Sequence, residues 1–332
     1  MQSDLHAGPA GAWRHADDPA ARVRCASFLT AEARSYDLAH PIDATAPASP
    51  FAQPLALRFE PTRGLPGTLH AGNGETLSGS LGQQGTHMDA LGHFGALASP
   101  WDGQGAFPAE RVRYFGGLDQ SQVKPDPHGG LRRLGIDAVP PLVTTGILLD
   151  AAAWLGIDEL PAGFEIGAAE IAAMLVCQGM QARGVRRGEA VFIHTGWGRR
   201  WSDPSRGAYY ASGPGLSIEG AAWLAAREPA VVGLDNPFTD PVNDGQLAQA
   251  APPPAGMRDG APFGTHHLNL VEAGVLQIQN LRLEALARDR VHEFAAIVIP
   301  LPLRGASGSV VRPVAIGTPA PAASFDAPPG VA

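Results

Sequence analysis

The sequence predicts an α/β fold. Short apolar runs bounded by Gly, Pro and Asp are typical of buried strands, and four of them lie at residues 145–150, 190–195, 230–235 and 295–300. Segments with apolar residues at helical spacing lie between the first three runs. This alternation of strand and helix favours an α/β domain with an internal sheet.

Two helices are predicted by the spacing of their apolar residues and by the residues at their ends. Within residues 167–184, the stretch from residue 170 reads EIAAMLVCQGMQARG and repeats apolar residues at helical intervals. The next helix, 217–228, opens with Ser217 as the N-cap and has Glu219 in its first turn. No glycine-rich phosphate loop follows any of the strands, so nucleotide binding has no support.

A later segment predicts a helix, a turn and a strand. Residues 265–270 read THHLNL, Gly274 stands at a helix C′ position, and residues 275–281 alternate polar and apolar side chains. Such a unit brings His267 close to Gln279. The alternative is that the histidine caps a helix and the strand is half exposed.

The two ends of the chain differ from its body. Residues 1–34 are rich in Ala, Asp and Arg and predict an arm or a helix that packs on the body or on another subunit. Residues 35–316 are expected to form the domain, and the Pro/Ala-rich residues 317–332 a tail.

Composition excludes several classes of function. The chain has 332 residues, a formal net charge of -8 and a single lysine, Lys124, which argues against nucleic-acid binding. No apolar stretch is long enough to span a membrane, and the first residues have no signal-peptide character. Cys25 and Cys177 are scattered, so both are expected to be reduced thiols in a cytoplasmic protein.

The most informative segment is residues 84–94, which read QGTHMDALGHF. Imidazole and carboxylate are donors that Zn²⁺ and Mn²⁺ share, and on an extended chain His87 and Asp89 face the same way. One segment therefore supplies two ligands to one ion. His93 follows Gly92, where the chain can turn back, and is either a third ligand or a histidine that moves protons near neutral pH. Thr86 is placed to support a ligand by hydrogen bonding.

From residue 36 to residue 316 the chain resembles the cyclase superfamily that includes bacterial kynurenine formamidase and isatin hydrolase. The family signature is similar to His-x-Gly-Thr-His-x-Asp-Ala-x-x-His, and residues 83–93 read QQGTHMDALGH. Further matches follow in the family's order at residues 146–150, 188–197, 214–217 and 233–236. The resemblance implies a single domain of the swivelling β/α/β type, with a mixed central sheet flanked by helices.

The resemblance also implies roles for individual residues. In relatives the signature histidines and aspartate bind the metal, the last histidine transfers protons, and a later His and Glu twelve residues apart complete the site. Carried over, His87 and Asp89 are ligands, His93 is catalytic and His267 is the later histidine. Two positions depart from the pattern, because Gln83 replaces the first histidine and Gln279 replaces the later glutamate.

These departures limit the number of metal ions that the site is expected to bind. A glutamine carbonyl can bind a divalent ion, but it is neutral and weaker than imidazole or carboxylate. One divalent ion, Mn²⁺ or Zn²⁺, is therefore expected, and a site that binds no ion is the alternative.

The expected function is metal-dependent hydrolysis of an amide C–N bond in a small cyclic or aromatic molecule. The metal lowers the pKa of a bound water that attacks the carbonyl, and His93 shuttles the proton. Phe94, Trp101 and Trp197 are candidate residues of the substrate wall. The alternatives are a metal-dependent lyase, dehydratase or cyclase of the same fold, and an inactive member that only binds a small molecule. By resemblance, a homodimer or homotetramer is expected.

Overall fold

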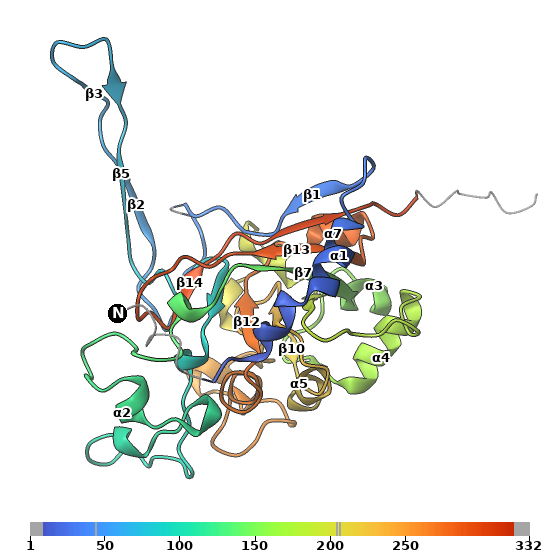
Figure 1. Ribbon diagram of the computed structural model, residues 1–332. Helices are drawn as coiled ribbons and strands as arrows, with labels where there is room; N and C mark the ends of the chain where they lie inside the picture. The colour runs from blue at the N-terminus through green and yellow to red at the C-terminus, as the bar shows by residue number, and fades with distance from the viewer. Residues whose placement is uncertain (1–8, 44, 204, 206, 322–332) are drawn as a thin grey trace, which may run out of the picture.

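The computed structural model describes residues 9–43, 45–203, 205 and 207–321. A large sheet runs through the body of the molecule (Figure 1). It has nine strands in the order β1-β15-β13-β7-β9-β11-β12-β6-β14. Its strands are β1 (Arg34–Asp37), β6 (His87–Asp89), β7 (Leu142–Asp150), β9 (Ala190–His194), β11 (Val231–Leu234), β12 (Leu276–Gln279), β13 (Glu293–Val298), β14 (Gly308–Val310) and β15 (Val314–Gly317). All four strands predicted from apolar runs are among them, as β7, β9, β11 and β13.

The sheet is mixed, as expected. Its centre, from β7 through β9 and β11 to β12, is parallel, whereas β13, β15 and β1 on one side and β6 and β14 on the other pair antiparallel. The carboxyl ends of the four parallel strands therefore meet at one edge of the sheet.

Helices cover the sheet because its strands are apolar on both faces. On β7, Ile147 and Leu149 point into one core and Leu148 points into the other. The first core lies under α3 (Ala151–Leu155), α4 (Ala168–Cys177) and α5 (Ile218–Ala225). Ser217 caps α5 as predicted, accepting a hydrogen bond from the Gly220 N–H at 3.0 Å.

The remaining elements are short. The helical ones are η1 (Ala12–Asp17), α1 (Pro19–Ala26), η2 (Leu91–His93), η3 (Ala109–Arg111), η4 (Phe115–Gly117), α2 (Gln120–Val123), η5 (Ile136–Ala138), η6 (Trp197–Trp201), η8 (Tyr209–Ala211), η9 (Gln246–Ala248), α6 (Gly264–His266), the π-helical η10 (His267–Ala273) and α7 (Glu284–Arg288). The short strands β8 (Glu165–Ile166) and β10 (Gly215–Leu216) pair with each other. No described helix is long and apolar enough to cross a membrane.

The N-terminal segment lies on the body of the molecule. Helix α1 contacts β7 and β13, and the side chain of Asp18 caps it by accepting from the Ala20 N–H at 3.0 Å. Strand β1 begins at Arg34 and β15 ends at Gly317. Residues 322–332 of the expected tail lie outside the described residues.

A long hairpin that the sequence analysis did not anticipate projects from the body (Figure 1). Its strands are β2 (Ala56–Phe59), β3 (Arg63–Gly64), β4 (Ala71–Gly72) and β5 (Glu75–Ser78), with β2 paired to β5 and β3 to β4. Phe59 and Leu69 are exposed along it. Its side chains lack strict alternation of polar and apolar types, which is why periodicity did not predict it.

Candidate metal centre

The carboxylate of Asp89 lies at the centre of a buried cluster of imidazoles. Its Oδ1 atom is 3.9 Å from Nε2 of His87 and 4.0 Å from Nε2 of His93, and its Oδ2 atom is 3.6 Å from Nε2 of His266. Asp89 is fully buried. One donor atom each from Asp89, His93 and His266 lie within 4.8 Å of one another, close enough for one ion.

Strand pairing positions His87 and Asp89. β6 lies between β12 and β14, with His87 opposite Gln279 and Asp89 opposite Gln277. Side chains two residues apart share a face, so His87 and Asp89 point the same way, as predicted, while Met88 points into the core.

Two glutamine amides complete the cluster. The Gln83 Nε2 atom lies 3.2 Å from Oδ1 of Asp89 and 3.2 Å from Nδ1 of His93. The Gln279 Nε2 atom donates to Oδ2 of Asp89 at 2.7 Å and lies 3.2 Å from Nε2 of His266. Both positions that depart from the family signature therefore contact the candidate ligands directly.

The later histidine in the cluster is His266, which corrects the expectation of His267. The His267 ring turns away to Glu272, with Nε2 3.0 Å from Oε1, and its side chain is 27% exposed against 9% for His266. The cause is the π-helical segment η10, because a π turn holds one residue more than an α turn. The residue that faces Gln279 is consequently thirteen positions before it instead of twelve.

Hydrogen bonds fix two of the imidazole rings. His266 Nδ1 bonds to the carboxylate of Asp240, which also accepts from the Thr265 N–H at 2.6 Å. His87 Nδ1 bonds to the carbonyl of Gly85 at 2.9 Å, so Nδ1 carries the proton and Nε2 is free to bind an ion. Neither His266 nor Asp240 was predicted from the sequence. Asp240 belongs to no recognisable motif, whereas the adjacent histidine pair was a signal that spacing alone could not resolve.

Thr86 acts on the backbone and not on a ligand ring. Its hydroxyl donates to the carbonyl of Asn280 at 2.6 Å and accepts from the N–H of His40 at 3.0 Å. The side chain of Asn280 in turn donates to the carbonyl of Gly85. Thr86 thus ties the residues before β6 to the end of β12.

Burial and charge set the protonation of the cluster. Burial lowers the pKa of His87 and of His93, which keeps both rings neutral near pH 7. Burial opposes ionisation of Asp89, but the surrounding imidazoles outweigh it and hold the pKa of this carboxyl well below its usual range. Burial also disfavours a charged His266, yet the carboxylates of Asp240 and Asp89 raise its pKa to about 10.

These residues fit a divalent ion. Neutral imidazoles and an ionised carboxylate are the forms that bind borderline cations. The Oε1 atom of Gln279 is buried without a hydrogen-bond partner, which leaves one further oxygen donor beside Asp89. In the ion-free chain His266 holds a proton that an ion at Nε2 displaces.

One cavity borders the cluster directly, and a second lies beyond Phe94. The His93 cavity, about 540 Å³, includes Gln83 and His93 in its wall. The aromatic cavity, about 590 Å³, is lined by Phe94, Trp101 and His267. The Phe94 ring centroid lies 5.2 Å from that of His266, so Phe94 borders the cluster.

Trp197 does not lie at this site. It is buried in a separate core, where its Nε1 donates to the carbonyl of Tyr209 at 3.2 Å. Its placement corrects the expectation that it forms part of the substrate wall. The aromatic side chains of this separate core pack against one another.

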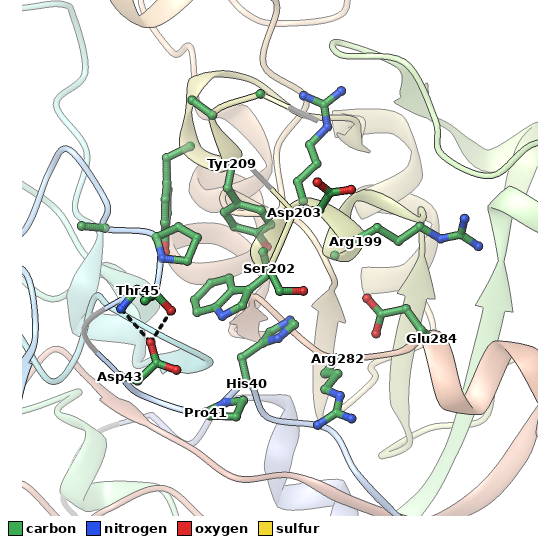
Figure 2. A pocket seen from close by; sticks show the side chains of 18 residues that line it. His40, Pro41, Asp43, Thr45, Arg199, Ser202, Asp203, Tyr209, Arg282 and Glu284 are labelled. Carbon is green, nitrogen blue, oxygen red and sulfur yellow. Dashed lines mark hydrogen bonds between the residues drawn. The ribbon is translucent and has the colours of Figure 1, made fainter. Parts of the chain in front are cut away.

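A larger cavity, about 920 Å³, is lined by none of the cluster residues. Figure 2 shows it bordered by His40, Tyr209 and Glu284. Tyr210 and Asn280 separate it from His87, since the Asn280 Nδ2 atom donates to the Tyr210 hydroxyl at 3.0 Å. We place the candidate centre at Asp89 because the donor groups converge there, irrespective of cavity size.

The fold is shared with known structures. A protein described as a novel cyclase is 24% identical, with a TM-score of 0.73 and coverage of 94% of both chains. Isatin hydrolase A from Labrenzia aggregata, bound to benzyl benzoate, is 20% identical, with a TM-score of 0.57 and coverage of 90% of this chain and 99% of the other. Isatin hydrolase A from Ralstonia solanacearum is 19% identical, with a TM-score of 0.57 and coverage of 91% and 98%. At these identities the likeness concerns the fold, and it confirms the predicted α/β architecture.

Sequence comparison identifies the family. A search of curated proteins by sequence found no significant match. The family model described as Putative cyclase matches residues 36–241, well over half of the chain, and this range contains His87, Asp89 and His93. His266 and Gln279 lie beyond the matched range and are placed by the structure alone. The chain belongs to the Putative cyclase family.

Proposed function

We propose that the protein is a metal-dependent hydrolase that cleaves an amide C–N bond of a small cyclic or aromatic molecule. The observation that carries this proposal is the convergence of His87, His93 and His266 on the buried carboxylate of Asp89. The family assignment and the structural likeness to isatin hydrolases support it.

His87, Asp89 and His266 would hold the ion, because Nε2 of each histidine lies within 4.0 Å of the Asp89 carboxylate, and the Oε1 atom of Gln279 would be a fourth donor. The cluster contains one carboxylate, which suits a single ion, Mn²⁺ or Zn²⁺, better than a pair of ions. When bound, such an ion lowers the pKa of water and polarises a carbonyl group.

His93 is the residue that moves the proton. Its side chain is 22% exposed and lines a cavity, whereas those of His87 and His266 are 5% and 9% exposed. Burial keeps the His93 ring neutral, so it can accept a proton from the attacking water and return it to the leaving nitrogen. The Gln83 Nε2 atom lies 3.2 Å from Nδ1 of His93, and Nε2 of the ring lies 4.0 Å from Oδ1 of Asp89.

The test combines metal content with turnover. The protein is purified with Mn²⁺ or Zn²⁺, its metal is measured, and isatin, N-formylkynurenine and related amides are assayed with and without chelator. We expect about one ion per chain and a chelator-sensitive hydrolysis that incorporates solvent oxygen. A chain that binds neither ion at micromolar concentration would contradict the proposal.

A second candidate is a member that binds a small molecule without turning it over. The observation in its favour is that two neutral amides, Gln83 and Gln279, contact Asp89 where relatives have charged or imidazole ligands. It predicts ligand binding that is unchanged in His93→Ala and no hydrolysis of any amide.

A further inference from the structure

The His93 cavity has an unusual balance of charge. Its volume of about 540 Å³ lies within the range of ligand sites, roughly 300–1,000 Å³. No carboxylate is among the residues that line it, although the chain as a whole carries a net charge of -8. Besides His93, its one ionisable group of basic character is Lys124, the single lysine of the sequence.

In the part of the chain that the structure describes, the Lys124 ammonium has no counter-charge. Among the described residues, none has a carboxylate within 4.0 Å of it, and its side chain donates no hydrogen bond there. The side chain is half-buried at the cavity wall. A half-buried cation without a partner, facing neutral groups in a concave site, attracts an anion more strongly than a fully solvated surface lysine does.

The backbone that carries Lys124 is held in place. Lys124 follows α2, and its N–H donates to the carbonyl of Gln120 at 2.8 Å. The Gln120 side chain returns a hydrogen bond to the Lys124 carbonyl at 3.1 Å and accepts one from the Tyr114 hydroxyl at 2.7 Å. Tyr114 lines the same cavity, so the ammonium is presented to it from a fixed main chain.

We propose that Lys124 binds a carboxylate group of the substrate, so that this enzyme acts on amides that carry a carboxylate near the scissile bond. The inference rests on the proposed function, since it identifies the His93 cavity as the place where the reacting amide lies beside His93. The carboxylate would contact Lys124 while the amide lies beside His93, since both residues line this cavity.

Binding tests the proposal without turnover. Anthranilate and anthranilamide share a ring and an amino group and differ in the charge of one substituent. Their affinities for the ion-free protein are measured by calorimetry, so that attraction of the carboxylate to a metal does not contribute. Lys124→Met should weaken anthranilate binding by about tenfold or more, the usual loss for a charge-assisted hydrogen bond, and leave anthranilamide unchanged. Lys124→Arg should restore most of the loss.

Arg132→Met is the matched control. Arg132 is exposed, does not line the cavity and carries the same charge eight residues along the chain. Equal loss in Lys124→Met and Arg132→Met, no loss in Lys124→Met, or no binding of anthranilate to the unmodified protein at millimolar concentration would each overturn the proposal.

Turnover by the metal-loaded protein separates this proposal from the parent one. N-formylanthranilate and formanilide are a matched pair of amides with and without a carboxylate. In Lys124→Met, KM for N-formylanthranilate should rise while kcat and the kinetics of formanilide stay the same. If neither amide is cleaved but the binding difference persists, the hydrolase proposal fails and the anion site stands.

Discussion

The side-chain nitrogen of Gln279 donates to Oδ2 of Asp89 at 2.7 Å, and the amide oxygen of the same residue is buried without a partner. The neutral amide therefore offsets none of the charge of Asp89, and its oxygen remains available to bind an ion beside that carboxylate. At residue 279, a side chain that raises the affinity for the ion is therefore expected to lower the stability of the ion-free protein.

Gln279→Glu should bind Mn²⁺ about tenfold or more tightly, because a carboxylate replaces a neutral amide at a donor position. Without the ion the variant should be less stable, since two carboxylates then share a buried site. Thermal unfolding with and without Mn²⁺ measures both effects. Gln53→Glu, at an exposed position, is the control and should show neither.

His266→Gln should abolish binding of a divalent ion, and His267→Ala should leave it nearly unchanged. His266 faces Asp89, whereas His267 contacts Glu272. Metal content after dialysis measures the difference, and circular dichroism checks that both variants fold. Retention of the ion by His266→Gln together with its loss from His267→Ala would refute this placement of the later histidine.

The ion-free protein should lose stability as the pH rises above neutrality. The pKa of His266 is raised from 6.5 to about 10 in the folded chain. A raised folded-state pKa contributes stability that is complete below pH 6.5 and is lost as the pH approaches 10. Urea unfolding at about pH 7 and about pH 9.5 measures the loss, which His266→Gln should reduce. Metal affinity should change in the opposite direction, because the ion displaces the proton of His266.

His93→Gln should lower kcat by about 10²–10⁴ while keeping the ion, since the variant removes proton transfer and leaves His87, Asp89 and His266 in place. His87→Ala provides the contrast and should lose the ion as well. Metal content measured beside steady-state rates separates the two roles. An ion lost equally from both variants would show that His93 is a ligand.

Much of the fold could be predicted from local pattern. The runs that became β7, β9, β11 and β13 are apolar because both faces of their strands are buried. The projecting hairpin from β2 to β5 escaped prediction for the converse reason, since its side chains are mostly exposed and show no periodic burial.

In the candidate site, too, local relationships could be predicted from the sequence and long-range ones could not. Local sequence was enough to predict that the side chains of His87 and Asp89 lie on one face, because residues two apart on an extended strand share a face, and that His93 lies close to them. These are relationships within seven residues of chain, and local geometry settles them.

The distant groups that meet Asp89 are set by long-range packing of the chain. The extra residue of the π-helical segment η10 turned His266 inward and His267 outward. The spacing of residues in the sequence does not reveal such a π turn. Pairing of β12 with β6 set Gln279 opposite His87, and packing of the loop after α2 brought Lys124 to the cavity of His93. Contacts between residues far apart in sequence depend on the whole packing of the chain, which no short motif encodes.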